Sequence, residues 1–121
     1  MRFMMIVKPP AYHDTQIDKA ELAAMGRYNE ELKRANVLVD MNGLAPTEDG
    51  AKIKFAGSRR TVIQGPFSEA TEVIGGYWII DVASKAEALD WAKRIPFGTE
   101  VHPGHEVEVE LRRVMEPSDF A

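Results

Sequence analysis

The sequence predicts an α+β fold, with strands and helices in the order βαββαβ and one extra hairpin inserted. Two segments show the helical spacing of apolar residues, and two strand-like segments have apolar residues on both faces. The chain has 121 residues, the length of one ordinary domain, so residues 1–121 are expected to form a single unit.

The first part of the chain is predicted to form a strand, a helix and a second strand. Residues 2–8 would be apolar on both faces of a strand, which indicates a central position in a sheet. Asp18 and Glu21 have the spacing of a helix-capping pair, which predicts one amphipathic helix over 18–34. The apolar positions of this helix are Leu22, Met25, Leu32 and Ala35. A second strand follows over 37–41.

The middle of the chain is predicted to form a hairpin over 51–64, because polar and apolar residues alternate on both sides of a turn at Gly57. Its basic side chains are Lys52, Lys54, Arg59 and Arg60. Two interpretations of this cluster remain open. It either recognises an anionic ligand or acidic partner, or forms a solvated edge that resists aggregation.

The second half repeats the order of a strand, a helix and a strand. Gly75 and Gly76 precede a strand over 77–82 that is apolar on both faces. Ser84 and Glu87 form a capping box, which predicts a helix that ends at 95–96. The apolar residues expected to face inward on this helix are Ala88, Leu89, Trp91 and Ala92. A last strand over 106–114 has one buried face and one wet face, since charged and apolar residues alternate.

This order matches the ferredoxin-like motif, in which right-handed crossovers place both helices on one face of the sheet. The other face has no predicted cover, although the strands at 2–8 and 77–82 are apolar on both sides. An uncovered apolar face is an association surface, so we expect a homodimer packed sheet to sheet. Trp78 is a candidate for this surface, but the sequence does not assign its face. Trp91 is expected in the core.

Composition and charge exclude several classes of protein. The chain has 15 basic and 19 acidic residues, a net charge of −4, so a nucleic acid would meet no general attraction. The absence of cysteine excludes disulfides, thiolate nucleophiles and Cys-containing metal sites. The longest uncharged apolar stretch, 73–80, is too short for a membrane helix. Residues 1–7 are too short for the apolar region of a secretion signal, so none is expected. We therefore expect a cytoplasmic protein without a membrane partner.

Histidines offer the remaining candidate metal ligands. They are His13, His102 and His105. The last two form an H-x-x-H pattern with glutamates nearby, but Pro103 and Gly104 between them disfavour the helix that would align the rings. We expect exposed loop histidines and no bound metal or cofactor.

The chain resembles the YCII-related proteins, in particular the branch named for its Asp-Gly-Pro-Phe motif. The matching stretches are Gly65–Phe67 with Glu69 and Glu72, Gly75–Asp81, Leu44–Pro46, Glu87–Ala92 with Ile95–Pro96, Val107–Val109 and Met115–Pro117. The resemblance implies a dimeric α/β-barrel built from ferredoxin-like subunits. It implies little chemistry, because most members have no established reaction.

Two positions depart from the pattern of the family. Gln64 replaces the motif aspartate, and an amide cannot cycle a proton near neutral pH. A neighbouring branch has a proposed catalytic histidine on the first helix, whereas residues 18–34 contain none. The resemblance therefore gives no support for acid–base catalysis by that pair.

A ligand pocket is predicted beside the Gly-Pro-Phe turn, formed by Gln64, Phe67, Glu72 and Tyr77. Glycine and proline set the local backbone, while Gln64 and Glu72 supply hydrogen-bonding groups. A purely structural alternative has Glu72 capping backbone amides and Gln64 simply ending a strand. No catalytic residue is assigned.

Three functions stay open on the sequence. The first is small-molecule binding, with or without catalysis, in this pocket. The second is a non-catalytic regulatory or interaction protein, since members of the family often accompany transcription-control proteins. The third is a metal- or haem-dependent oxygenase-like protein, with His13 or His102 as the candidate haem ligand.

Overall fold

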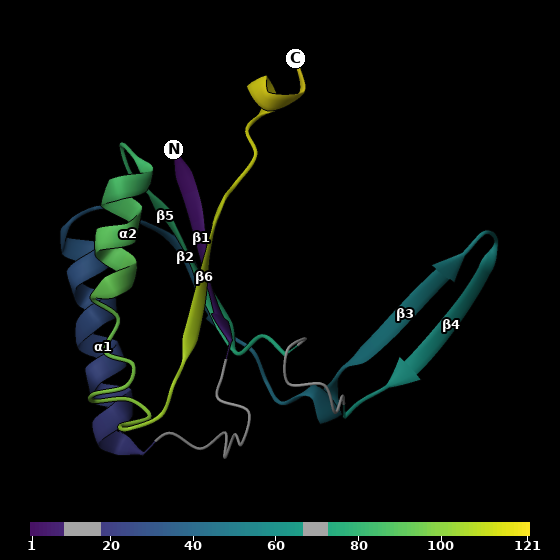
Figure 1. The fold of residues 1–121 in the computed structure, drawn as a ribbon, viewed down its shortest axis with the longest axis horizontal. Helices are drawn as coiled ribbons and strands as arrows, with labels where there is room; N and C mark the ends of the chain where they lie inside the picture. Colours follow the sequence, from purple (N-terminus) through teal and green to yellow (C-terminus); the bar gives the residue numbers. More distant parts are fainter. Residues whose placement is uncertain (9–17, 67–72) are drawn as a thin grey trace.

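The computed structural model describes residues 1–8, 18–66 and 73–121. Figure 1 shows a four-stranded sheet with two helices on one side and a separate hairpin on the other. The sheet consists of β1 (Arg2–Lys8), β2 (Leu38–Gly43), β5 (Gly76–Asp81) and β6 (Glu108–Arg113). The helices are α1 (Lys19–Arg34) and α2 (Lys85–Lys93), and the hairpin is β3 (Ala51–Ala56) with β4 (Arg59–Gln64). Two short 3₁₀ turns are η1 (Thr47–Asp49) and η3 (Pro117–Phe120).

The sheet has the order β2-β5-β1-β6, and all neighbouring strands are antiparallel. The α+β class is confirmed, and the arrangement is consistent with a ferredoxin-like fold. Both helices lie on the same face, as the right-handed crossovers require (Figure 1). The last strand is shorter than predicted, and β2 continues two residues beyond the predicted end to Gly43.

Both helices begin at the predicted caps. The Asp18 carboxylate accepts a hydrogen bond from the Glu21 N–H at 2.9 Å, and Ser84 Oγ accepts one from the Glu87 N–H at 3.1 Å. Glu87 Oε2 also accepts from the N–H of Ala83, the residue before the N-cap, at 2.9 Å. These contacts satisfy N–H groups that the first turn of a helix leaves without a backbone partner.

The core lies between the helices and one face of the sheet. Its buried members include Phe3, Met5, Tyr28, Leu32, Trp78, Ile80 and Ala88. Trp78 donates its indole N–H to Asn29 Oδ1 at 2.8 Å and meets Tyr28 edge to face, with 5.5 Å between ring centroids. Burial raises the pKa of Tyr28, so its hydroxyl stays protonated and donates to the Trp91 carbonyl at 2.8 Å. Trp78 therefore lies on the face of the sheet that the helices cover. The suggestion that it belongs to the association surface is wrong.

The opposite surface of the sheet, which we call the open face, carries the alternate residues of the same strands. Met4 is paired with Ile79, and Ile6 with Tyr77, across β1 and β5. These four side chains are only partly buried, and no helix of the described residues covers them (Figure 1). The prediction that both central strands are apolar on two sides is thus confirmed.

Charged groups lie beside this apolar strip, on β6 and at the end of β1. Lys8 Nζ is 3.2 Å from Glu110 Oε1, and Arg112 Nη1 is 3.3 Å from Glu110 Oε2. Hydrogen bonds from Lys8 and then Arg112 lower the pKa of Glu110. The open face therefore has an apolar centre with a charged margin.

The segment after β6 is fastened to the sheet by an ion pair. Arg113 donates from both terminal nitrogens to the two oxygens of Asp119, each at 2.9 Å, and the Glu116 N–H donates to Asp119 Oδ2 at 2.6 Å. These contacts, led by the hydrogen bond from Arg113, lower the pKa of Asp119 to about 2.

This pKa gives a testable expectation for Arg113→Gln. In the unaltered chain the Asp119 contacts are fully present above its ordinary pKa of 3.8 and are lost as pH falls through about 2, because the folded state favours the ionised form. Without the guanidinium, the pKa of Asp119 is expected to rise towards 3.8. Carboxyl NMR titration measures both values, and the same low pKa in the variant would contradict the assigned cause.

Candidate functional site

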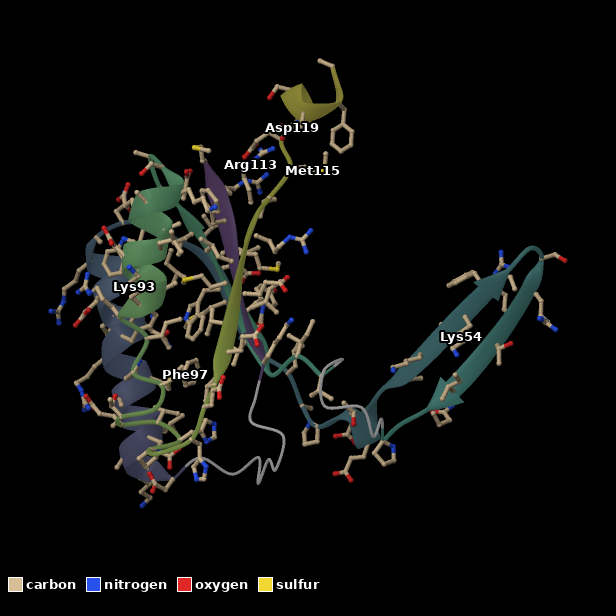
Figure 2. All side chains as sticks on the ribbon, in the orientation of Figure 1. Lys54, Lys93, Phe97, Arg113, Met115 and Asp119 are labelled. Atoms are coloured by element: carbon tan, nitrogen blue, oxygen red, sulfur yellow. The ribbon has the colours of Figure 1, made fainter. Side chains whose placement is uncertain are left out.

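A cavity of about 420 Å³ opens where β1 ends and β5 begins, between α1 and the sheet. Its walls come from segments far apart in the sequence: Val7, two residues of α1, residues 41–47, residues 73–78, and the loop after α2. Phe97 of that loop lies between the helices and the sheet (Figure 2). The volume is in the range of small-molecule sites.

Bare backbone forms one wall of the cavity. The Gly75 N–H donates to the Val7 carbonyl at 2.8 Å, and the Leu44 N–H donates to the Gly75 carbonyl at 3.0 Å. A Cβ at Gly76 would lie 2.8 Å from the Asn42 carbonyl oxygen, so only glycine fits at this position of β5 beside β2. The Gly75–Gly76 pair thus lets β2 and β5 approach closely beside the cavity.

Asn29 presents a directed hydrogen-bond donor at the cavity. Its Oδ1 accepts from the Trp78 indole N–H, so the amide nitrogen is the group that remains available to a ligand. Among the described residues, this nitrogen has no hydrogen-bond acceptor. Asn29 can therefore donate to a ligand oxygen without losing its contact with Trp78.

Tyr77 borders the cavity from the other side of β5. Its hydroxyl accepts from Asn42 Nδ2 at 2.8 Å and donates to Asp40 Oδ2 at 2.9 Å. Both of its hydrogen-bonding directions are used within the sheet. Tyr77 therefore acts as a fixed part of the wall.

His102 offers a second polar group at the cavity, with two ring nitrogens that can form hydrogen bonds. Its ring stacks on Phe97 with 6.3 Å between centroids and 18° between planes, from a backbone with φ of 50°. No described residue forms a hydrogen bond to either ring nitrogen. His102 can donate or accept, since neutral imidazole has one nitrogen of each kind.

The described lining of the cavity contains no Asp, Glu, Lys or Arg. Its apolar side chains are Val7, Met25, Met41, Leu44, Ala45, Pro46, Val73, Ile74, Trp78, Phe97 and Val101. Against these described walls a charged ligand group would lose hydration and find no opposite charge. The arrangement suits an uncharged ligand with one or two polar atoms.

The predicted site residues lie partly at this cavity. Tyr77 borders it, whereas Gln64 is exposed at the end of β4, opposite Ala51, and is absent from the described lining. Phe67 and Glu72 lie outside the described residues. The stretch that follows them, residues 73–76, forms part of the wall, so the cavity adjoins the predicted segment.

Sequence reasoning missed Asn29 and assigned His102 to an exposed loop. Asn29 is four residues after Met25 and shares its helix face, which was an available signal. His102 is half-buried beside Phe97, while His105 is exposed and His13 lies outside the described ranges. In residues 1–8, 18–66 and 73–121, no three His, Asp or Glu side chains form a group that could hold a metal ion.

The fold and cavity define a class of small antiparallel α+β proteins with a pocket between helix and sheet. A family model for the YCII-related domain matches residues 1–115, so the chain belongs to this family. An uncharacterised protein of Rhizobium meliloti (strain 1021) is 40% identical over 50 residues, which cover 41% of this chain and 40% of that protein. The matched region is thus about two fifths of the length of that relative. Neither helix in the described part of the chain has the length and apolar content needed to span a membrane.

Proposed function

We propose that this YCII-related protein binds a small, uncharged and mostly apolar molecule in the cavity beside the Gly-Pro-Phe turn. The cavity carries the proposal, because it combines a volume of about 420 Å³ with apolar walls and a few convergent polar groups. Aromatic rings at Phe97 and Trp78 favour a ligand with a flat apolar body. The Asn29 amide favours a carbonyl or hydroxyl oxygen on that body.

The proposed site works by binding more than by proton transfer. Gln64 stands at the aspartate position of the Asp-Gly-Pro-Phe branch, to which we assign this chain. An amide there supplies a donor and an acceptor but no general base. Phe67 and Glu72 are proposed to complete the site on the side of the turn, with Gln64 and Tyr77.

The assembly that we propose is a homodimer of single-domain subunits, each formed by residues 1–121. The open faces of two copies would pack together as a dimeric α/β-barrel. The apolar centre at Met4, Ile6 and Ile79 supports this, because such a strip would otherwise face water.

Asn29→Asp tests the proposed ligand class. The carboxylate keeps an acceptor for the Trp78 indole but replaces the free N–H₂ group by a negative charge. We expect 2-acetylnaphthalene, a neutral ketone probe, to raise the melting temperature of the unaltered protein more than 2-naphthoate does. In Asn29→Asp we expect affinity for the ketone to fall by about tenfold or more.

Asn36→Asp is the matched control, since Asn36 is exposed beyond the end of α1. It makes the same chemical change outside the cavity and should leave affinity for the probe unchanged. Equal loss in both variants, or preference for the naphthoate, would contradict the neutral-ligand proposal. Native mass spectrometry of protein purified without additives would identify a retained ligand.

The second candidate is a regulatory or interaction protein without catalysis. The observation in its favour is the exposed apolar surface of the β3–β4 hairpin, where Ile53, Phe55 and Val62 are all accessible. Absence of binding to every neutral probe, together with a stable complex with a different protein, would favour it.

A further inference from the structure

The β3–β4 hairpin, which we call the arm, has two unlike faces. In an antiparallel pair, residues opposite one another lie on the same side of the ribbon. Ile53 is opposite Val62, with Phe55 two residues further along that side. Lys54 is opposite Thr61 on the other side. The arm therefore has an apolar face and a polar, basic face.

The apolar face is exposed to solvent. The exposed fractions are 54% for Ile53, 56% for Val62 and 68% for Phe55. Arg60 lies over one side of the Phe55 ring, 4.6 Å from its centroid, and leaves the rest uncovered. A two-stranded ribbon is marginally stable in water without a covering layer, so this face requires a partner.

The arm is held away from the sheet of its own chain. The Gly65 N–H donates to the Gly50 carbonyl at 2.9 Å, and a Cβ at Gly65 would collide with the Thr47 carbonyl oxygen. This close contact fixes the base of the arm. Figure 1 shows the arm extending from there on the side of the sheet opposite the helices, where the open face also lies.

Charge favours another copy of this chain as the partner. The arm contains four of the 15 basic residues and none of the 19 acidic residues, so the remainder has 11 basic residues against 19 acidic ones. Two copies thus attract one another through unlike regions, and a closed dimer satisfies both contacts at once.

A second exposed apolar group lies at the opposite end of the sheet. Phe120 is 75% exposed and Met115 is 53% exposed. Their segment is anchored where β1 begins, since the Val114 N–H donates to the Arg2 carbonyl at 2.9 Å. The arm begins beyond the other end of β1, where Gly75 meets Val7. A two-fold axis perpendicular to the strands brings these opposite ends together in a dimer packed through its open faces.

We propose that the apolar face of the arm docks on segment 114–121 of a second copy, with Phe55 packed against Met115 and Phe120 of that copy. Each copy gives one arm and receives one, so the dimer contains the contact twice. This inference rests on the proposed homodimer and adds to it a second contact between the copies, arm against segment 114–121, which we call the clasp. Arg60, which is opposite Phe55 on the docking face, then lies near Glu116 and Asp119, the acidic groups of that segment.

Photocrosslinking tests the contact directly. Benzoylphenylalanine replaces Phe55 in one sample and Lys54 in a control sample, and each is mixed with ¹⁵N-labelled protein before irradiation. Isotope labels separate crosslinks between copies from those within one copy. We expect position 55 to link to residues 114–121 of the other copy and position 54 to give little product there. Links from position 55 within one copy only, or to another region of the second copy, would overturn the proposal.

Dimer dissociation gives an independent measure. By sedimentation equilibrium we expect Phe55→Ser and Phe120→Ser each to weaken the dimer by about tenfold, and the double variant to weaken it little further. Lys54→Ser should change it by less than about twofold. If Ile79→Asp dissociates the dimer but Phe55→Ser does not, the homodimer stands and the clasp is overturned. A monomeric unaltered protein at micromolar concentration would overturn both.

Discussion

Replacement of Trp78 by alanine is expected to lower the free energy of unfolding by about 3–5 kcal/mol, the range for loss of a large buried aromatic side chain. Trp78 is 5% exposed and packs edge to face against Tyr28. The substitution leaves a cavity and removes the hydrogen bond to Asn29. Denaturation in urea, followed by far-UV circular dichroism, measures the loss.

One further variant separates the packing of Trp78 from its hydrogen bond, and a second compares Trp78 with the other tryptophan. Trp78→Phe keeps an aromatic ring but no donor, and is expected to cost less than Trp78→Ala, with about 1 kcal/mol due to the lost bond. Trp91→Ala removes a tryptophan that is only partly buried and lies under Arg94, 4.3 Å from its ring centroid. Its cost should be clearly smaller than that of Trp78→Ala. Equal costs at the two positions would contradict the assignment of Trp78 to the centre of the core.

Ile79→Asp is expected to weaken the proposed dimer by about a hundredfold or more, since it places an unpaired carboxylate in a buried interface. Ile79 lies on the open face opposite Met4, and its neighbours on β5 point into the core. The monomer should keep its fold, because the new charge faces water when the partner is absent. Sedimentation equilibrium measures the change in dimer stability, and circular dichroism checks the fold.

Leu22→Asp serves as the matched control for added charge. Leu22 is 63% exposed on α1, so this substitution should leave the dimer unchanged. Unchanged assembly in Ile79→Asp, with the fold retained, would contradict packing through the open face. Loss of the fold in the same variant would instead place Ile79 in the monomer core.

The α+β class, the caps and the two-sided strands could be predicted because each depends on local pattern. Alternation placed Trp78 and Ile80 on one face, but it did not decide which face the helices cover. The hydrogen bond from Trp78 to Asn29 joins residues 49 positions apart. Such a contact depends on how α1 crosses the sheet, which no local pattern contains.

The buried sides of the two helices were predicted only in part. Leu32 is buried as expected, but Leu22 faces water and Tyr28 occupies the centre of the stripe on α1. Tyr28 was missed because a polar hydroxyl is not expected in the core. In the structure this hydroxyl donates a hydrogen bond to the Trp91 carbonyl. On α2, Ala88 is buried, whereas Leu89 is 38% exposed.

The candidate site was harder to predict than the fold because its walls combine several segments. Gly75 and Gly76 line the cavity, although the sequence marked them only as the residues before a strand. Asn29 and His102 come from other parts of the chain, and each looks ordinary in its own sequence context. Asn29 and His102 line the same cavity only because α1, β5 and the loop after α2 lie close together in the fold.

The two stretches that connect the arm to the sheet are also walls of the cavity. Residues 44–47 precede the arm, residues 73–76 follow it, and both groups line the pocket. If the proposed dimer holds the arm, its contacts at the root of the arm can change the shape of the pocket in which the proposed ligand binds. Thermodynamic linkage makes this relation reciprocal. Ligand titrations at two protein concentrations would then yield two apparent affinities, and ligand saturation would change the concentration at which copies associate.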